Sequence, residues 1–163
     1  MADVVDIASW AARKAAGDAH EDRTRDELWL RGWTVDLLGQ GAMSEGVTSI
    51  LGRTKSPLRY LPEFIAGRRG ELCLIDCKGR ISPTTGRHSI SRAAVRAHVA
   101  MWSLFDLPIY YVFETMGVMT PFDVQRLADM RSGGRGGAYY LVPAIEARPF
   151  DAFFGDQPFR AAA

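Results

Sequence analysis

The stretch LPEFIAGRRGELCLIDCKG, residues 61–79, places two carboxylates and one amine in two short apolar runs. Glu63 belongs to the first run, and Asp76 and Lys78 close the second. Side chains two residues apart on a strand point the same way, so we expect Asp76 and Lys78 on the face that carries Leu74. An acid and a base held side by side at a strand end indicate a metal ion and an activated water.

The charge distribution indicates a polyanionic partner. The whole chain has a net charge of +1, but residues 46–105 hold ten bases and only three acids. Two of those acids are Glu63 and Asp76, so the candidate carboxylates lie in a basic surround. Such a field attracts a polyanion to the site. The alternative is that these arginines only form a solvated face.

Length and composition predict one domain with a substantial core. The chain has 163 residues, 47% of them hydrophobic, and this length buries roughly two thirds of the unfolded surface. We expect a single domain over 1–163, with an N-terminal helix at 1–17, a core at about 18–142 and a C-terminal tail at 143–163. The sequence has no apolar run long enough for a membrane span and no signal-peptide pattern. We therefore expect a soluble, cytoplasmic protein.

The two cysteines are expected to be reduced thiols. Cys73 and Cys77 lie four residues apart on one predicted strand, which is a poor geometry for a disulfide. They face away from Asp76 and Lys78. No second pair of cysteines is available for a zinc site.

Hydrophobic periodicity and turn residues predict an α/β architecture, with a loop or loose hairpin at 39–58. Helix patterns and caps predict helices at 3–16 (ended by Gly17), 19–31 (capped by Asp18), 89–105 (capped by Ser89 or Ser91), and after Thr120 and Pro121. Branched and aromatic runs predict strands at 33–40, 59–66, 71–78, 109–114 and 138–143. This order is typical of a single mixed β-sheet flanked by helices. The strand of Asp76 and the strand IYYVFE should be parallel, joined through the long helix.

The order of these residues resembles the PD-(D/E)XK nuclease superfamily, especially its Holliday-junction-resolvase-like branch. The match consists of a helical Glu21, Gly32 before an apolar strand, Pro62-Glu63, and Asp76-Cys77-Lys78. It covers about residues 18 to 113, and the segment around the two short strands is its most specific part. The resemblance implies a restriction-endonuclease-like fold.

The resemblance also implies a magnesium-dependent DNA endonuclease that hydrolyses phosphodiester bonds in duplex or branched DNA. Glu63, Asp76 and the backbone carbonyl of Cys77 would bind one Mg²⁺, for which Mn²⁺ could substitute, and Glu21 would bind a second metal through water. Lys78 would lower the pKa of the attacking water or hold it in place. Relatives of this type imply a homodimer, and the small size suits a phage or a mobile element.

One residue departs from the family pattern, because Glu63 stands where the family has its first aspartate. A glutamate is one methylene longer but is still an oxygen ligand for a hard cation. This departure leaves a second hypothesis open, a catalytically inactive nucleic-acid-binding module of nuclease fold. A third reading is an exonuclease or an RNA-directed nuclease.

Several side chains remain between a functional and a structural interpretation. Asp76 and Lys78 have a structural ion pair as the alternative, Glu21 has a solvated helix residue, and His98 is favoured as a packed or surface histidine. The C-terminal PFDAFFGDQPF, with four phenylalanines, fits either a partner surface or a tail packed back on the sheet. Residues 77–105 contain no acid at all, and the expected DNA contacts lie there: Arg80, Arg87, His88, Arg92 and Arg96.

Overall fold

The centre of the protein is a six-stranded mixed sheet, seen in a computed structural model that describes residues 4–79, 81–128 and 138–156. The strand order is β1-β2-β3-β5-β6-β8. Only β3 and β5 are parallel, and the other neighbours are antiparallel. The strands are β1 (Thr34–Leu37), β2 (Phe64–Arg68), β3 (Glu71–Lys78), β5 (Ile109–Phe113), β6 (Gly117–Met119) and β8 (Arg148–Pro149). The predicted fold class is thereby confirmed.

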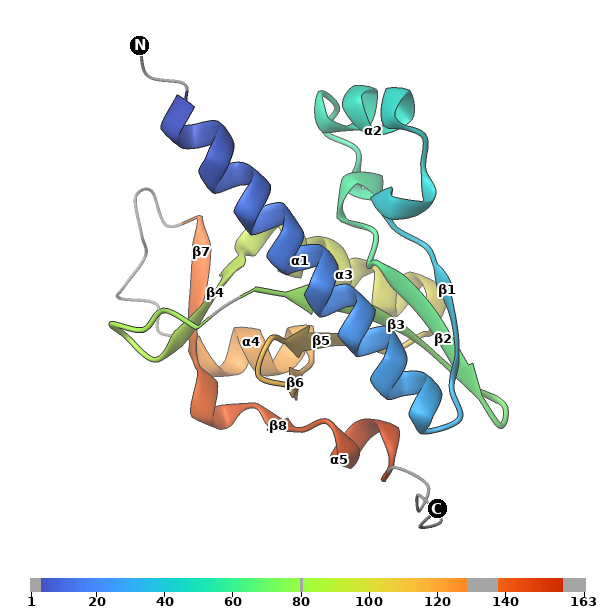
Figure 1. Cartoon of the computed structure of the whole chain (residues 1–163). Helices are drawn as coiled ribbons and strands as arrows, with labels where there is room; N and C mark the ends of the chain where they lie inside the picture. The colour runs from blue at the N-terminus through green and yellow to red at the C-terminus, as the bar shows by residue number, and fades with distance from the viewer. Residues whose placement is uncertain (1–3, 80, 129–137, 157–163) are drawn as a thin grey trace, which may run out of the picture.

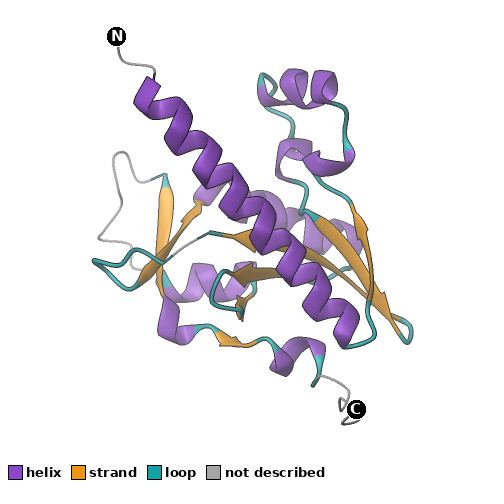
Figure 2. Cartoon of the chain, viewed as in Figure 1, coloured by secondary structure: helices purple, strands orange, loops and turns teal. Residues whose placement is uncertain are grey.

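Helices cover both faces of this sheet (Figures 1 and 2). The long helix α1 (Val4–Leu30) crosses one face, where its Leu28 packs with Cys73 and Ile75 of β3. The helix α3 (Arg92–Phe105) lies on the other face, where Val95 packs with Leu74. Odd and even positions of β3 therefore enter two different cores, as strand alternation predicts. No helix among the described residues is both long enough and apolar enough to span a bilayer.

The helix α1 is continuous, so the predicted break at Gly17 is wrong. A glycine inside a helix costs only about 1 kcal/mol relative to alanine. The buried side chains of His20, Thr24 and Leu28 anchor the following turns against the sheet. Asp18 does not cap a new helix but forms an ion pair with Lys14 one turn earlier.

The segment predicted as a loop at 39–58 is mostly helical. It contains η1 (Gln40–Ala42), α2 (Glu45–Gly52) and η2 (Pro57–Tyr60). Ser44 caps α2 through a hydrogen bond from Val47 N, and Ser56 caps η2 through one from Leu58 N. The glycines scattered through 39–58 favoured a loop in the sequence prediction, although Ser44 and Ser56 are typical N-cap residues. Because η2 occupies 57–60, β2 begins at Phe64, later than predicted.

A second, two-stranded sheet lies beside the main one. It pairs β4 (Arg87–Ser91) with β7 (Tyr139–Pro143), so the predicted last strand exists but does not join the central sheet. The helix α3 begins at Arg92, and the expected cap Ser91 accepts a hydrogen bond from Ala94 N. The predicted helix starts at residue 89, and no strand is predicted at 87–91. In the structure these residues pair with β7, and their side chains alternate between buried and more exposed positions.

The end of the described chain packs back onto the core. After α4 (Pro121–Leu127), which has the predicted Thr120 cap and Pro121 start, the chain forms β7, η4 (Ala144–Glu146), β8 and α5 (Asp151–Phe154). Phe150 and Phe154 are buried, and Phe153 packs against the same core. The packed-back alternative therefore holds for three of the four C-terminal phenylalanines. Phe159 lies outside the described residues.

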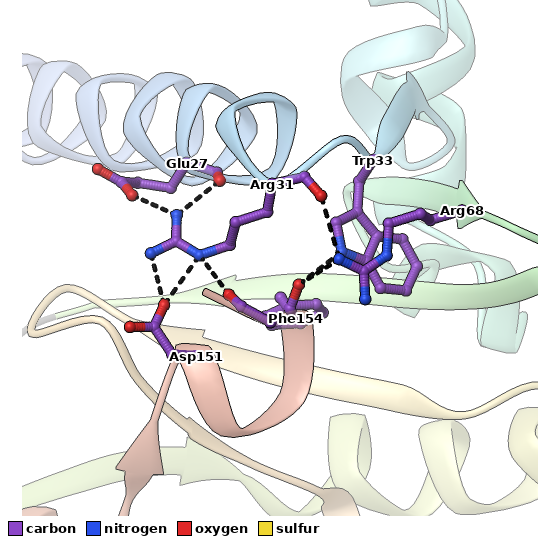
Figure 3. Close-up of polar contacts among 7 residues, drawn as sticks. Glu27, Arg31, Trp33, Arg68, Asp151 and Phe154 are labelled. Atoms are coloured by element: carbon purple, nitrogen blue, oxygen red, sulfur yellow. Dashed lines mark hydrogen bonds and ion pairs between the residues drawn. The ribbon is translucent and has the colours of Figure 1, made fainter. Parts of the chain in front are cut away.

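A buried arginine ties this C-terminal segment to the end of α1 (Figure 3). The Nη1 group of Arg31 donates to the backbone oxygen and to Oε2 of Glu27 at 2.7 and 2.5 Å. Its Nη2 group donates to Asp151 Oδ1 at 2.6 Å, and its Nε group donates to the carbonyl of Gly155 at 2.8 Å. One guanidinium thus joins α1 to α5 by charge-assisted hydrogen bonds.

A second arginine completes this contact. Arg68 Nη1 donates to the carbonyls of Arg31 and Phe154 at 3.0 and 2.9 Å. Trp33 Nε1 donates to the Phe154 carbonyl at 3.0 Å, and the Arg68 guanidinium lies 4.7 Å from the centre of the Trp33 ring. The end of α5 is therefore capped by side chains of β2 and of the α1–β1 connection.

We predict that Arg31→Met lowers the free energy of unfolding by about 2–3 kcal/mol, because it removes several hydrogen bonds to charged and carbonyl groups. Urea unfolding followed by circular dichroism measures this change. Lys14→Met on the same helix is the matched control, since an exposed ion pair contributes little. Equal midpoints for the two variants would contradict the role of Arg31.

Candidate active site

The β2–β3 pairing brings Glu63 beside Asp76. Phe64 pairs with Ile75, so Glu63 lies just beyond the ladder, opposite Asp76. The Glu63 carboxylate accepts a hydrogen bond from the backbone N–H of Cys77 at 2.8 Å. The two carboxylates singled out in the sequence thus lie together at the open end of the hairpin, where β2 begins and β3 ends.

The backbone of Glu63 is fixed from β1. Its carbonyl accepts hydrogen bonds from Leu38 N at 2.8 Å and from Gly39 N at 3.3 Å. A Cβ atom on Gly39 would lie 2.8 Å from the carbonyl oxygen of Pro62. Gly39 is therefore required for the close approach of the two chains that holds Glu63 in place.

Asp76 and Lys78 form an ion pair on one face of β3, as alternation predicted. Asp76 is only 4% exposed, and its Oδ2 atom has no hydrogen-bond partner of good geometry among the described residues. The Lys78 ammonium lies 5.3 Å from the centre of the Tyr111 ring. A buried carboxylate oxygen is thus held by ion pairing alone.

Burial and mutual repulsion separate the pKa values of the two carboxyls. Burial raises the pKa of Glu63 well above its ordinary value, and the neighbouring Asp76 charge raises it further. Burial acts in the same direction on Asp76, but Lys78, the contact with Glu63 and the nearby His98 outweigh it and lower the Asp76 pKa. Without a cation, the pair therefore favours a protonated Glu63 beside an ionised Asp76.

Lys78 stays an ammonium despite its burial. Burial lowers its pKa, but the charges of Asp76 and Glu63 outweigh this effect and raise the pKa above the ordinary lysine value. A protonated lysine donates hydrogen bonds and has no lone pair with which to accept a proton.

Glu21 reaches the same pocket from α1. The pocket has a volume of about 480 Å³. Burial raises the pKa of Glu21, and the charges of Asp18 and Asp76 contribute to this rise. The lining residues are Lys14, Asp18, Glu21, Leu37, Gln40, Gly41, Arg59, Tyr60, Leu61, Glu63, Asp76, Lys78, Ala94 and His98. All four side chains predicted as catalytic therefore line one pocket.

The predicted DNA-binding arginines lie outside this pocket lining. Arg92 donates a long hydrogen bond to the Tyr139 carbonyl at 3.4 Å, with its guanidinium 4.9 Å from the centre of the Tyr140 ring. Arg96 is exposed on α3, and Arg87 is half-buried on β4. Arg80 lies outside the described residues. Any phosphate contact of Arg87, Arg92 or Arg96 therefore falls beside the pocket rather than inside it.

His88 is buried rather than presented to a ligand. Its side chain is 1% exposed and stacks on Phe113 with ring centres 3.7 Å apart. Burial lowers its pKa to about 4, so the ring is neutral at physiological pH. A ring buried in this way is not exposed for a contact with phosphate. The sequence pattern predicts no strand at 87–91, and this burial follows from the pairing of β4 with β7.

The sequence prediction did not include two cations that line the pocket, Lys14 and Arg59, because both lie outside the acid-free stretch 77–105. His98, favoured as a packed or surface histidine, is packed. Lys14 precedes Glu21 by seven residues, nearly two helical turns, and this spacing would have placed both on one face of α1. His98 is 1% exposed, and its Nδ1 atom lies 3.7 Å from Asp76 Oδ2.

The two cysteines are free thiols, as predicted. Burial raises the pKa of Cys73 to about 12. Burial, together with the Glu63 charge, also raises the pKa of Cys77. Both thiols are therefore protonated and unreactive at neutral pH.

The protein side chains do not form a complete metal cage. Among the described residues, no three His, Cys, Asp or Glu side chains come together in a way that could hold a metal ion. The candidate oxygen ligands are the Glu63 and Asp76 carboxylates, with Glu21 lining the same pocket from α1.

Comparison with solved structures gives a likeness in fold. The chain is similar to Hjc, a Holliday junction resolvase from Archaeoglobus fulgidus, with a TM-score of 0.59 and 15% sequence identity. The match covers 85% of this chain and 100% of that one. No family model matches the sequence, and neither does any curated protein. The chain therefore has the mixed α/β, nuclease-like fold of this resolvase.

We predict that Glu63→Gln raises the free energy of unfolding at pH 7–8 in the absence of divalent ions. A raised carboxyl pKa means that folding favours the protonated form, so the wild type loses stability as pH rises above the ordinary glutamate value of 4.5. The variant lacks this loss. Its advantage should disappear below about pH 4, where Glu63 is protonated in both states.

Urea unfolding at pH 4, 6 and 8 measures the difference. Glu71→Gln, at the exposed start of β3, controls for the general loss of one carboxylate. A wild type as stable as Glu63→Gln at every pH would show that Glu63 carries no burial penalty.

Proposed function

We propose that this protein is a divalent-cation-dependent nuclease that hydrolyses phosphodiester bonds in duplex or branched DNA. One observation carries the proposal: Glu63 and Asp76 are held side by side, next to the Lys78 ammonium, where β2 begins and β3 ends in the central sheet of a resolvase-like fold. A buried and a half-buried carboxylate with one neighbouring cation retain a strong tendency to bind more positive charge. Glu21, which lines the same pocket, adds to this tendency.

The residues present fit Mg²⁺ or Mn²⁺ in their donor chemistry. Hard cations take oxygen ligands, and Mg²⁺ keeps several waters, so it does not need a cage of protein side chains. The buried Asp76 Oδ2 atom lacks a hydrogen-bond partner and is paired only with Lys78. Glu63, Asp76 and the backbone carbonyl of Cys77 would hold the ion, and Glu21 would act through a water.

Bound Mg²⁺ would supply a hydroxide at neutral pH and a positive charge on the scissile phosphate. Lys78 would donate a hydrogen bond to the attacking oxygen. Burial lowers its pKa, but in the metal-free site the charges of Asp76 and Glu63 outweigh this effect and raise it. As an ammonium beside the ion, Lys78 would lower the pKa of the attacking water and stabilise negative charge that develops on the phosphate.

Cleavage assays test this proposal. With Mg²⁺ or Mn²⁺, we expect cutting of supercoiled, linear or four-way-junction DNA, and a loss of at least about 100-fold in Asp76→Asn, the scale expected when a group that stabilises transition-state charge is removed. Asp36→Asn is the matched control, because Asp36 is exposed on β1. Cleavage of closed circles separates an endonuclease from an exonuclease, and an RNA arm tests the RNA-directed alternative.

The cations of the pocket are proposed to bind the DNA backbone. Lys14 from α1 and Arg59 from η2 line the same pocket as the carboxylates. We predict that Arg59→Gln weakens DNA binding and lowers the slope of log affinity against log salt by about 1, the value for one lost phosphate contact. Arg126→Gln, exposed on α4 and not part of the pocket lining, is the control. Equal salt slopes in fluorescence anisotropy would exclude Arg59 from the interface.

A homodimer is the proposed assembly, because cutting both strands of a duplex calls for two sites. Light scattering on the free protein and on its complex with DNA measures the stoichiometry.

A binding module without catalysis is the second candidate, and two observations favour it. Glu63 replaces the aspartate of the family pattern, and among the described residues no third His, Cys, Asp or Glu side chain joins the pair in a group that could hold a metal ion. This candidate expects DNA binding that survives Asp76→Asn and no cleavage with any divalent ion. Metal-dependent cutting that Asp76→Asn abolishes would eliminate it.

A further inference from the structure

His98 joins three elements at the candidate site. It lies on α3, is 1% exposed, and places its Nε2 atom 2.6 Å from the carbonyl oxygen of Tyr60 in η2. Its Nδ1 atom lies 2.7 Å from the hydroxyl of Tyr111 on β5 and 3.7 Å from Asp76 Oδ2 on β3. One buried ring therefore contacts the helical segment before Glu63, the central strand and the catalytic carboxylate.

The partners of His98 fix which nitrogen carries the proton. A carbonyl oxygen only accepts, so Nε2 must be the donor to Tyr60. Burial lowers the pKa of His98 and keeps the ring neutral, so Nδ1 has a free lone pair. Nδ1 accepts a hydrogen bond from the Tyr111 hydroxyl, which is thereby turned toward His98.

Tyr111 would otherwise have another acceptor close by. Asp76 and Tyr111 are register partners on the parallel strands β3 and β5, so their side chains share one face. Tyr111 is fully buried, and a buried hydroxyl without a partner carries a penalty of about 1–3 kcal/mol. In the absence of His98, the charged carboxylate of Asp76 is the nearby group to which this hydroxyl can donate.

We infer that His98 is a positioning residue that holds the Tyr111 hydroxyl away from Asp76, leaving the carboxylate available to Lys78 and a divalent cation. This inference rests on the proposed function, because it assigns His98 a role toward the proposed cation. Tyr111 also places its ring 5.3 Å from the Lys78 ammonium, and the hydrogen bond from His98 Nε2 to the Tyr60 carbonyl joins η2 to the site. Such supporting hydrogen bonds typically change metal affinity or activity by about 10- to 100-fold when removed.

Mn²⁺ titration calorimetry on the full chain tests the inference without requiring cleavage. His98→Leu should bind Mn²⁺ about 10- to 100-fold more weakly than the wild type. His98→Gln, whose amide supplies both a donor and an acceptor, should retain most of the affinity. The double variant His98→Leu/Tyr111→Phe should recover affinity, because no hydroxyl remains to occupy Asp76.

The recovery separates positioning from a structural role. If His98 only fills space, the double variant should be no better than His98→Leu, and that result would overturn the inference. Equal Mn²⁺ affinity in His98→Leu and wild type would also overturn it. Urea unfolding of each variant confirms that the compared proteins are folded, and a folded His98→Gln still gives the comparison if His98→Leu does not fold.

The outcomes also distinguish the inference from the proposed function. Mn²⁺ binding that depends on His98 as expected, without cleavage of any DNA, would support the inference and remove the nuclease proposal. Cleavage by the wild type with unchanged Mn²⁺ affinity in His98→Leu would do the reverse. A wild type that binds no Mn²⁺ would overturn both.

Discussion

The burial of Asp76 on the central strand is the constraint on which the site depends. A carboxylate at 4% exposure needs positive charge nearby, and Lys78 supplies it from the same face of β3. Glu63 adds a second carboxylate at the same place. Burial and the neighbouring Asp76 charge raise its pKa, so an ionised Glu63 costs free energy here. Elements around the pocket fix this unfavourable arrangement: β1 holds the Glu63 backbone, α3 brings His98 to Asp76, and α1 covers the adjoining face.

Local sequence features predicted the central hairpin and the polar set on it. Period-two alternation placed Asp76 and Lys78 on one face and Cys73 and Cys77 on the other, because strand geometry depends only on adjacent residues. The parallel pairing of β3 and β5 followed from the helix between them. Glu21 joined this set through the resemblance to the nuclease superfamily, because no strand or helix period links it to Asp76.

The remaining features depended on contacts between distant segments. His88 is buried because β4 pairs with β7, some fifty residues later, and no local pattern encodes that partner. Arg59 lines the pocket because η2 folds over the strand ends, and the glycines around α2 hid this structure. His98 gained its role from Tyr60 and Tyr111, which no periodicity connects to it. The charge distribution along the chain indicated a basic region, but it did not indicate that Lys14 and Arg59 line the pocket with Glu63 and Asp76.

Rigidity is distributed unevenly along α1. Arg31 fixes the C-terminal end of the helix to α5, whereas Glu21 lies ten residues earlier, about 15 Å along the helix axis. Toward its N-terminus α1 extends past the central sheet (Figure 1), and Lys14 and Glu21 line the pocket. The anchored end of the helix is thus separate from its pocket-lining part, so the fold can be stabilised at Arg31 without adding bulk near the pocket.

The hydrogen bonds to the Glu63 carbonyl have a consequence for the order of folding. The site needs β1 docked on the residues before β2, β3 paired with β5 across a crossover of some thirty residues, and α3 closed over Tyr111. Contacts of such sequence separation form late, since loop closure must precede them. A chain still emerging from the ribosome would have the hairpin but not the pocket. The pocket would therefore form only when the chain has folded as a whole, whereas the local hairpin that carries Asp76 and Lys78 can form before it.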